Sequence, residues 1–349
     1  MKLAASILAV AIVVGGAYAA FTYYWLSPTE RFAPPRELTI EKGESFRQIA
    51  QALAGAGVVR SALALRLYGQ MSQTARQIKP GDYAFNGGER IPDVMRHLVR
   101  GDFVVVTVTI PEGLTVHQIA ERVAETSLVC EDEFEQAARD GAMVRALGLM
   151  PLGAEGYLFP ATYRFSPHAK TNDVLAAMLA RFYQVLTPAV EERMFEVGLD
   201  ARRLVTMASM VEKEAKAPGE RGLIAGVFYN RLRLKMPLQS DPTAEYDLDG
   251  AMQSAASAVH TASAFNTYDF TGLPPGPIAN PGLKSIEAAL YPTQTEFLYF
   301  VAREGGTHVF SKSFDEHRRA IAIERKLGAN PAGAPARKSA SKPAAMPVK

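Results

Sequence analysis

The sequence predicts an α+β protein with an N-terminal transmembrane helix, a small β/α module and a larger α+β domain. Three observations indicate this fold class: an uncharged apolar run at the start of the chain, a pattern of strand, glycine turn and amphipathic helix that occurs twice, and a later part in which amphipathic helices alternate with polar turns. A length of 349 residues fits two folded units, since a domain commonly holds roughly 100 to 200 residues.

The composition narrows the function classes. Hydrophobic residues make up 48% and charged residues 21% of the chain, which is near the average of globular proteins, so the chain as a whole is neither disordered nor polytopic. The net charge of +2 is due to residues 327–349, which hold four basic residues and no acidic one. The rest of the chain is slightly acidic and offers no basic surface for nucleic acid.

The sequence contains none of the common motifs for metal binding, nucleotide binding or serine-hydrolase catalysis. Cys130 is the only cysteine, which excludes an intramolecular disulfide and a multi-cysteine metal cage, and we assign it no role. The six histidines are scattered singly, and there is no P-loop, G-x-S-x-G, H-E-x-x-H or dinucleotide-binding glycine motif. We therefore expect neither a metal nor an organic cofactor.

Residues 1–26 are predicted to form a membrane anchor. No residue from Leu3 to Leu26 is charged, and about 20 apolar residues suffice to cross a bilayer. A cleaved signal peptide is the alternative, because Ala-Tyr-Ala at 17–19 resembles a cleavage site. The anchor is favoured because the apolar run continues into an aromatic cluster at 21–26, which is typical of a membrane interface. The flanking charges barely distinguish the two orientations.

A proline-rich stretch and a weak internal repeat follow the apolar run. Residues 27–37 contain three prolines and predict a stiff, extended spacer. Residues 40–54 and 110–124 then share the order strand, glycine turn, amphipathic helix. The first copy, with the block at 79–85, resembles the LysM-like module of cell-wall proteins, and we assign this module to 38–103. The module either associates with glycan or only orients the next domain by packing.

The larger domain is predicted over residues 104–326 and begins with a β-branched strand at 104–110. Residues 327–349 are rich in alanine, proline, glycine, serine and lysine and contain no aromatic residue. Such a segment cannot bury enough apolar surface to fold, so we predict a disordered tail.

A helix predicted over residues 202–217, ended by Pro218, carries two candidate acids. At about 100° per residue, Glu212 and Glu214 lie about 160° apart at opposite borders of the apolar face, so they cannot point into one cleft. Desolvation at such a border raises the pKa of a carboxyl group toward the range of a general acid. Helix geometry leaves open which glutamate has this role, and whether both are ordinary surface charges.

Three polar blocks suggest a cleft in the same domain. Residues 153–163 combine an acid with aromatic rings, residues 238–243 form a compact polar loop, and residues 265–278 form a rigid proline-rich turn. Each block alone is commonly structural, but their combination in one domain favours a binding site for sugar rings.

These blocks, in this order, resemble the MltG (YceG-like) family of endolytic murein transglycosylases, from the anchor to about residue 325. The matching motifs are EGYLFP at 155–160, LVTMASMVEKE at 204–214, VFYNRL at 227–232, QSDPT at 239–243 and NTY through PPG at 266–276. In that family the second glutamate of the E-K-E triplet is catalytic, which implies Glu214. Ala161 and Phe265 stand where the family often has Asp and Tyr.

The resemblance implies a periplasmic lyase that cuts peptidoglycan. Residues 104–326 would then be the catalytic domain, on a chain held in the inner membrane by one span with its N-terminus in the cytoplasm. Glycan strands are the implied substrate, and the membrane and peptidoglycan synthases are the implied partners. Besides Glu214, the residues expected to bind substrate are Glu155, Tyr157, Asn230, Gln239, Ser240, Asp241, Thr243 and Tyr268. Asn230, together with Arg231, could instead brace the helix pair.

Two other function classes remain open on the sequence. The chain could be a non-catalytic glycan-binding scaffold of the cell-wall machinery. It could also be a glycan hydrolase, which would need a second carboxylate, with Asp241 as the candidate. The products of cleavage distinguish the three classes, since they yield anhydro ends, no cut ends or reducing ends.

Overall fold

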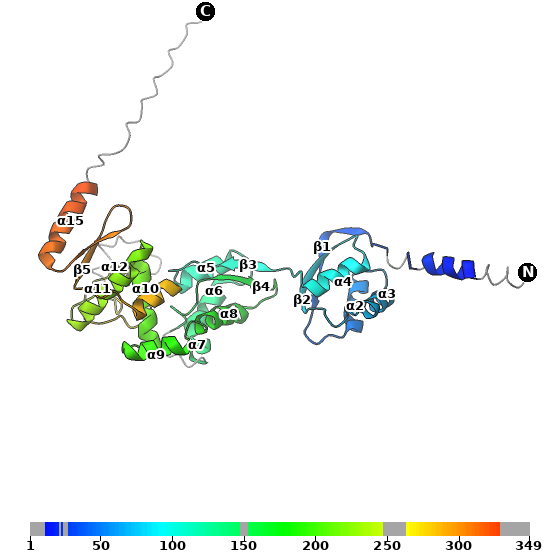
Figure 1. Cartoon of the computed structure of the whole chain (residues 1–349), viewed down its shortest axis with the longest axis horizontal. Helices are drawn as coiled ribbons and strands as arrows, with labels where there is room; N and C mark the ends of the chain where they lie inside the picture. The colour runs from blue at the N-terminus through cyan, green and yellow to red at the C-terminus, as the bar shows by residue number, and fades with distance from the viewer. Residues whose placement is uncertain (1–10, 21, 24–26, 147–152, 247–262, 329–349) are drawn as a thin grey trace, which may run out of the picture. The chain divides into compact units, whose positions relative to one another are not determined.

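The protein combines helices with short strand pairs, which confirms the predicted α+β class. A computed structural model describes residues 11–20, 22–23, 27–146, 153–246 and 263–328 (Figure 1). Across these residues the strands form three separate two-stranded sheets. The chain divides into two compact units, one of residues 1–109, 123–130 and 162–174, the other of residues 110–122, 131–161 and 175–349.

The predicted anchor lies only partly within the described residues, of which residues 11–20 and 22–23 are helical. Among the described residues, none of the helices has both the length and the apolar character that crossing a membrane requires.

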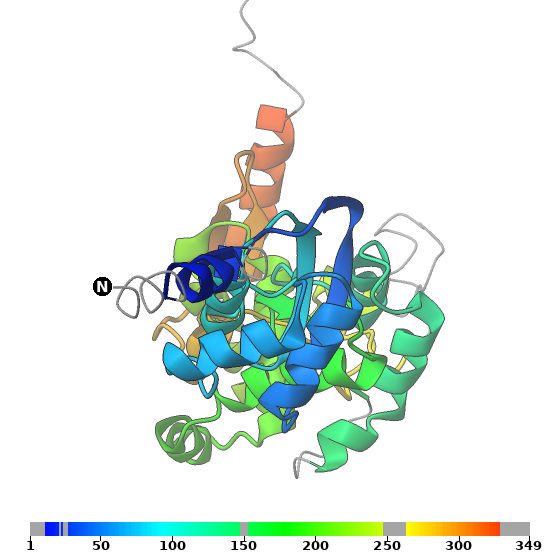
Figure 2. The same ribbon diagram turned by 90° about the vertical axis from the view of Figure 1, so that its right-hand side faces the viewer.

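The predicted small module contains one antiparallel strand pair and three helices. Its elements are β1 (Arg31–Ile40), α2 (Phe46–Gly55), α3 (Ala62–Met71), β2 (Gly81–Gly87) and α4 (Ile91–Arg100). Ile40 pairs with Gly81 and Arg36 with Phe85, and the helices lie on one side of the two strands (Figures 1 and 2). The buried cluster between strands and helices includes Leu53, Tyr83 and Leu98. This module therefore has an apolar core of its own.

The predicted spacer differs from the structure, because residues 31–37 belong to β1 and not to a free linker. The register of the β1–β2 pair shifts between Arg31 and Arg36, across Pro34 and Pro35. Proline lacks the N–H that a continuous ladder needs, but irregular or edge positions of a sheet tolerate it. The prolines thus interrupt the ladder without ending the strand.

Both copies of the internal repeat have the predicted order of elements. After β1 the chain turns at Gly43, with φ +99°, and enters α2, whose N-cap residue Ser45 forms a capping box with Gln48. After β3 (Val106–Thr109) it turns at Gly113, with φ +80°, and enters α5 (Val116–Ala124). β3 pairs antiparallel with β4 (Thr162–Phe165).

The remaining elements are mostly helical, and α10 (Ala201–Glu214) is central among them. All its residues from Leu204 to Val211 are buried, and the helix packs against α14 (Leu283–Leu290), α11 (Arg221–Arg233) and α12 (Asp241–Glu245). The other elements are α6 (Glu131–Asp140), α7 (Ala142–Ala146), α8 (Thr171–Tyr183), α9 (Pro188–Glu196), η1 (Pro218–Glu220), β5 (Tyr299–Ala302), β6 (His308–Ser311) and α15 (Phe314–Gly328).

Two helix ends differ from the predicted boundaries. α10 ends at Glu214 and not at Ala217, because Ala215 leaves the helical region with φ −78° and ψ 101°. α15 continues through Gly328, two residues beyond the predicted end of the larger domain at residue 326, and so includes the first two residues of the predicted tail. The rest of the predicted disordered tail lies outside the described residues.

Candidate active site

The carboxyl group of Glu214 lies at the end of α10 and accepts a hydrogen bond from a buried serine. The hydroxyl oxygen of Ser240 is 2.5 Å from Oε1 of Glu214. Burial raises the pKa of Glu214 to about 7, and the charges of Asp241 and Glu245 act in the same direction, whereas the Ser240 hydrogen bond and Lys216 act against it. A carboxyl group with a pKa near neutrality can both donate and accept a proton.

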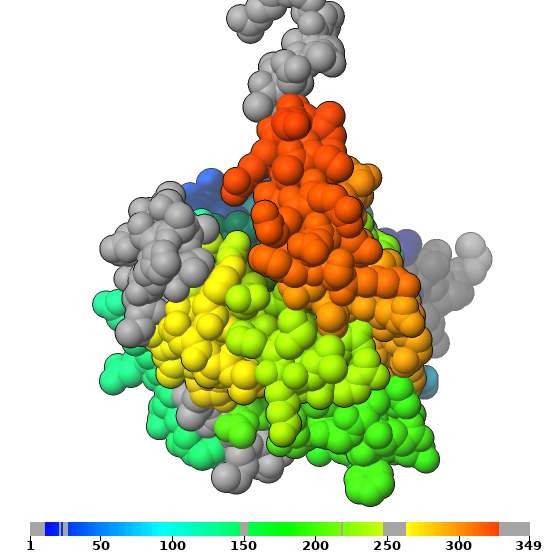
Figure 3. All heavy atoms as spheres, turned by 90° about the vertical axis from the view of Figure 1, so that its left-hand side faces the viewer, coloured from blue at the N-terminus to red at the C-terminus, as the bar shows by residue number. Residues whose placement is uncertain are grey.

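A second chain segment holds the loop that carries Ser240. Ser240 N donates to Thr267 Oγ1 at 3.1 Å, and the hydroxyl groups of Thr243 and Thr267 are 2.8 Å apart. Gln239 adopts a φ of +50°, and its N–H donates to the carbonyl of Thr267 at 3.1 Å. Two of the predicted polar blocks are thus joined, and the joining residue, Thr267, was not among the predicted site residues. In Figure 3 the segment after Ser263 (yellow) lies against the yellow-green surface of α11 and the loop that follows it.

Asp241 and Tyr268 form a pair next to Glu214. The hydroxyl group of Tyr268 donates to Oδ1 of Asp241 at 2.6 Å. Burial raises the pKa of Tyr268, and its hydrogen bond to Asp241 adds to this effect, so the phenol stays protonated at neutral pH. Thr243, by contrast, is fully buried and donates to the carbonyl of Ser240 at 2.7 Å. Its position fits a role in shaping the loop and not in contacting substrate.

Glu212 contacts a different part of the molecule, as its helical spacing from Glu214 predicted. Its carboxylate accepts from Arg221 Nη2 at 3.1 Å and from the N–H of Gly282 at 3.0 Å, and only 7% of its side chain is exposed. A Cβ atom at Gly282 would overlap the carboxyl group of Glu112, so a larger residue there would require the Glu112 side chain to move. The Glu212–Arg221 ion pair therefore braces α10 against α11 and the start of α14, a role that the sequence analysis missed.

Donors from three other described segments contact the carboxylate of Glu155. Its carboxylate accepts from Val116 N at 3.0 Å, from the Tyr246 hydroxyl at 3.1 Å and from Asn280 Nδ2 at 2.9 Å. Asn280 in turn accepts from the N–H of Leu158 at 2.8 Å. Glu155 thus fixes three distant segments to one another, and Asn280, which the sequence did not indicate, also connects it to the backbone of Leu158.

The structure corrects the prediction for Tyr157. Its side chain is fully buried and contacts Phe182 edge-on, with ring centroids 5.1 Å apart. A ring with no exposed face cannot stack on a sugar, so Tyr157 is part of the core. Composition suggested a binding wall because an aromatic residue beside turn residues suits either location.

The structure also favours the bracing alternative for Asn230. Its amide nitrogen donates to the carbonyls of Thr295 at 2.8 Å and Phe297 at 3.0 Å. The neighbouring Arg231 donates to the carbonyls of Leu298 at 2.7 Å and Leu238 at 2.8 Å. Both side chains are buried, and Arg231 also donates to Oε1 of Gln239 at 3.3 Å. Because the Asn230 amide donates to backbone carbonyls, the prediction that Asn230 binds substrate is not supported.

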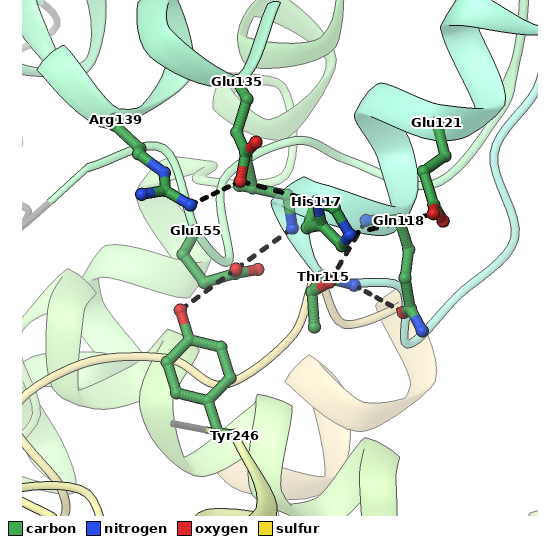
Figure 4. Close-up of polar contacts among 9 residues, drawn as sticks. Thr115, His117, Gln118, Glu121, Glu135, Arg139, Glu155 and Tyr246 are labelled. Atoms are coloured by element: carbon green, nitrogen blue, oxygen red, sulfur yellow. Dashed lines mark hydrogen bonds and ion pairs between the residues drawn. The ribbon is translucent and has the colours of Figure 1, made fainter. Parts of the chain in front are cut away.

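A cavity of about 290 Å³ opens beside Glu155. Figure 4 shows the Tyr246 hydroxyl group directed at the Glu155 carboxylate, and His117 between Glu135 and Glu121. The lining residues are Thr115, Val116, His117, Glu135, Ala138, Arg139, Gly153, Ala154, Glu155, Tyr246, Phe265, Gly276 and Pro277.

Within the described part of the chain, three side chains lie close enough to share a metal ion. These are His117, Glu121 and Glu131, whose possible ligand atoms lie within 4.8 Å of one another. His117 and Glu121 are exposed, and Glu214 is not one of the three.

Comparison with known proteins identifies similar chains. The model of the YceG-like family matches residues 38–323. A Bacillus subtilis protein named endolytic murein transglycosylase is 33% identical over 329 residues, which cover 88% of this chain and 90% of that protein. A Streptococcus pneumoniae protein of the same name is 32% identical over 81% of this chain, and the match spans 57% of its length. A crystal structure of a YceG-like protein from Listeria monocytogenes is 29% identical, with a TM-score of 0.57, over 83% of this chain and 99% of that one.

Proposed function

The chain belongs to the YceG-like family, and on this premise we propose that it is an endolytic murein transglycosylase with Glu214 as its single acid/base. The substrate is an uncrosslinked peptidoglycan strand, cut within its length at the β-1,4 bond between MurNAc and GlcNAc. The observation that supports Glu214 in this role is the environment of its carboxyl group. Burial raises the pKa of Glu214 to about 7, and Ser240 donates a hydrogen bond to Oε1.

The reaction needs only one carboxyl group because the nucleophile belongs to the substrate. Glu214 protonates the glycosidic oxygen as the bond to C1 of MurNAc breaks, and GlcNAc leaves with a free hydroxyl group. The C6 hydroxyl of the same MurNAc then attacks C1, and the Glu214 carboxylate takes its proton. A 1,6-anhydro ring closes, no water is consumed, and Glu214 is protonated again. An attached nucleophile has a high effective concentration, so the protein mainly transfers protons and positions the strand.

Ser240 and Asp241 would assist Glu214 in different ways. Ser240 donates to Oε1, so the other carboxyl oxygen, Oε2, is the one to carry the transferred proton. The Ser240 hydrogen bond also stabilises the carboxylate formed in the first step. Asp241 accepts from Tyr268 and has its negative charge near Glu214, which suits stabilisation of the positive charge that develops at C1.

The test is the Glu214→Gln variant, which keeps the size of the side chain but cannot transfer the proton. We expect glycan binding and the fold to persist while turnover falls by about 10²- to 10⁴-fold. Mass spectrometry of uncrosslinked strands after incubation counts the 1,6-anhydroMurNAc ends, and Glu192→Gln, at an exposed residue of α9, serves as the matched control. A near wild-type rate in Glu214→Gln would refute the assignment. Reducing ends from the wild-type chain would instead favour the hydrolase with Asp241.

We extend the proposal to where the enzyme works, namely with residues 1–26 retained as an anchor in the inner membrane and the catalytic domain in the periplasm. The support is the uncharged apolar run from Leu3 to Leu26 and a substrate that lies outside the cytoplasmic membrane. N-terminal sequencing of the membrane-bound protein is expected to find residues before Ala17, and a mature chain that starts at Ala20 contradicts the anchor.

A further inference from the structure

The cavity beside Glu155 lies close to Glu214 along a short path. The path is α12: Ser240, its N-cap residue, donates to Glu214, and Tyr246, its C-cap residue, lines the cavity. A helix of this length spans about 8 Å at about 1.5 Å per residue. A sugar chain extended along α12 would therefore reach the cavity within a few rings of the bond that Glu214 cleaves.

The charges around the cavity suit a neutral ligand that is rich in hydroxyl groups. Arg139 lies 2.5 Å from Glu135, and His117 lies 3.6 Å from the same carboxylate. Both basic groups thus face an acid, so an added anion would have to compete with Glu135 for them. Glu155 and Thr115 add further hydrogen-bonding groups to the lining.

Two aromatic rings give the cavity an oriented apolar wall. The ring centroids of Tyr246 and Phe265 are 4.8 Å apart, at an interplanar angle of 55°. Because the Tyr246 hydroxyl group donates to Glu155, the ring is fixed from one end. Pro277, Val116, Ala138 and Ala154 add further apolar surface to the lining. A few polar groups around an apolar wall are typical of small-ligand sites, and the volume is near the lower end for such sites.

We propose that this cavity is a binding subsite for a sugar ring of the strand under cleavage, with Tyr246 and Phe265 as the rings that the sugar contacts. This inference rests on the proposed function and deepens it. A strand held at a ring away from the scissile bond is bound along its length, and this favours cleavage within the strand over removal of a terminal unit. Glu155 acts here as a positioning residue, because it orients Tyr246 through the 3.1 Å hydrogen bond.

The test compares substitutions that remove a ring with one that keeps it. In a Glu214→Gln background, which does not turn over, the dissociation constant for uncrosslinked glycan strands is measured by calorimetry. Tyr246→Ala and Phe265→Ala should each weaken binding about tenfold, because each removes part of the wall. Tyr246→Phe keeps the ring and loses only the hydrogen bond to Glu155 that orients it, so it should weaken binding less than Tyr246→Ala does. Tyr291→Ala, at an exposed aromatic residue that does not line the cavity, is the matched control.

The outcomes separate this inference from the proposed function. Circular dichroism identifies any variant that fails to fold. If Tyr246→Ala does not fold, the affinity of Phe265→Ala alone tests the subsite. Unchanged affinity in the folded ring-removal variants, or an equal loss in Tyr291→Ala, overturns the subsite. A wild-type chain that produces no anhydro ends refutes the enzymatic function by itself. A wild-type chain that produces them while the ring-removal variants bind normally refutes only the subsite.

Discussion

At the scale of single residues, the position of Glu214 at the last residue of α10 decides its chemistry. The helix runs through the core and ends where Ala215 turns away, so the Glu214 carboxyl group is desolvated but remains beside the polar loop of Ser240. Five residues earlier, Ser209 is fully buried, and its hydroxyl group donates to the carbonyl of Thr206 and accepts from the N–H of Ile278. The end of the helix thus combines a desolvated carboxyl group with a hydroxyl donor from the loop at Ser240.

The first prediction concerns pH. Glu214 must be protonated in the free enzyme to act as the acid, so kcat/KM should fall above a pH of about 7, by about tenfold per pH unit. Below that pH the carboxyl group is already protonated, and the profile should show no second limb from an essential base. Lys216→Ala should move the fall to higher pH, because the Lys216 charge lowers the pKa of Glu214.

Lys213→Ala is the control for this measurement, since Lys213 is an exposed cation of the same helix that does not contribute to the Glu214 pKa. An equal displacement in both variants would mean that the general charge of the protein, and not the local one, moves the profile. A bell-shaped profile would indicate a second essential carboxylate and support the hydrolase alternative.

What the sequence could not predict at this scale is burial. Periodicity placed Glu212 and Glu214 on opposite borders of one helix, but it could not tell which one has an ionic partner. The structure does so by pairing Glu212 with Arg221 at 3.1 Å. The prediction for Tyr157 was wrong for the same reason. An aromatic residue between turn residues can face solvent or the core, and the ring of Tyr157 contacts Phe182 in the core.

At the scale of elements, local patterns predicted the two β-turn-α units well, because each turn requires a backbone conformation that glycine adopts readily. Gly43 and Gly113 both have positive φ and both precede an amphipathic helix. The prolines of β1 were misleading because sequence alone does not show that the ladder shifts its register around them.

The second prediction concerns the brace between α11 and the segment before β5. Asn230→Ala removes the donors to the carbonyls of Thr295 and Phe297 and leaves both carbonyls without these partners. We expect the free energy of unfolding, measured with urea, to fall by about 1–3 kcal/mol. KM for glycan strands should stay unchanged, because the Asn230 side chain donates to backbone carbonyls and does not face the candidate site.

Glu192→Ala, at an exposed position of α9, is the control and should leave the unfolding free energy within about 0.5 kcal/mol of wild type. A large rise in KM with normal stability would return Asn230 to the set of substrate-binding residues.

At the scale of the whole molecule, the candidate site depends on contacts between residues far apart in sequence. Glu155 and Asn280 are 125 positions apart, and Ser240 and Thr267 are 27 apart. The sequence indicated the separate blocks because each has its own turn-rich composition. It could not indicate Thr267 or Asn280 as the links, since no local pattern marks a side chain whose partner is so distant.

The last prediction concerns the boundary of the N-terminal module. The core cluster of this module, together with the side chains packed against it, lies entirely between Phe32 and Leu98. The residues predicted as a spacer are attached to this module: the carbonyl of Pro28 accepts from Arg60, Thr29 donates to the carbonyl of Val58, and residues 31–37 pair with β2.

A fragment of residues 27–103 should therefore fold alone, with a cooperative thermal transition followed by circular dichroism. A fragment of residues 38–103, cut at the boundary that the sequence suggested, exposes most of β2 and should melt at a markedly lower temperature or without cooperativity. Equal stability of the two fragments would show that residues 27–37 are a spacer after all, and a non-cooperative longer fragment would show that the module needs residues 123–130 or 162–174 of its compact unit.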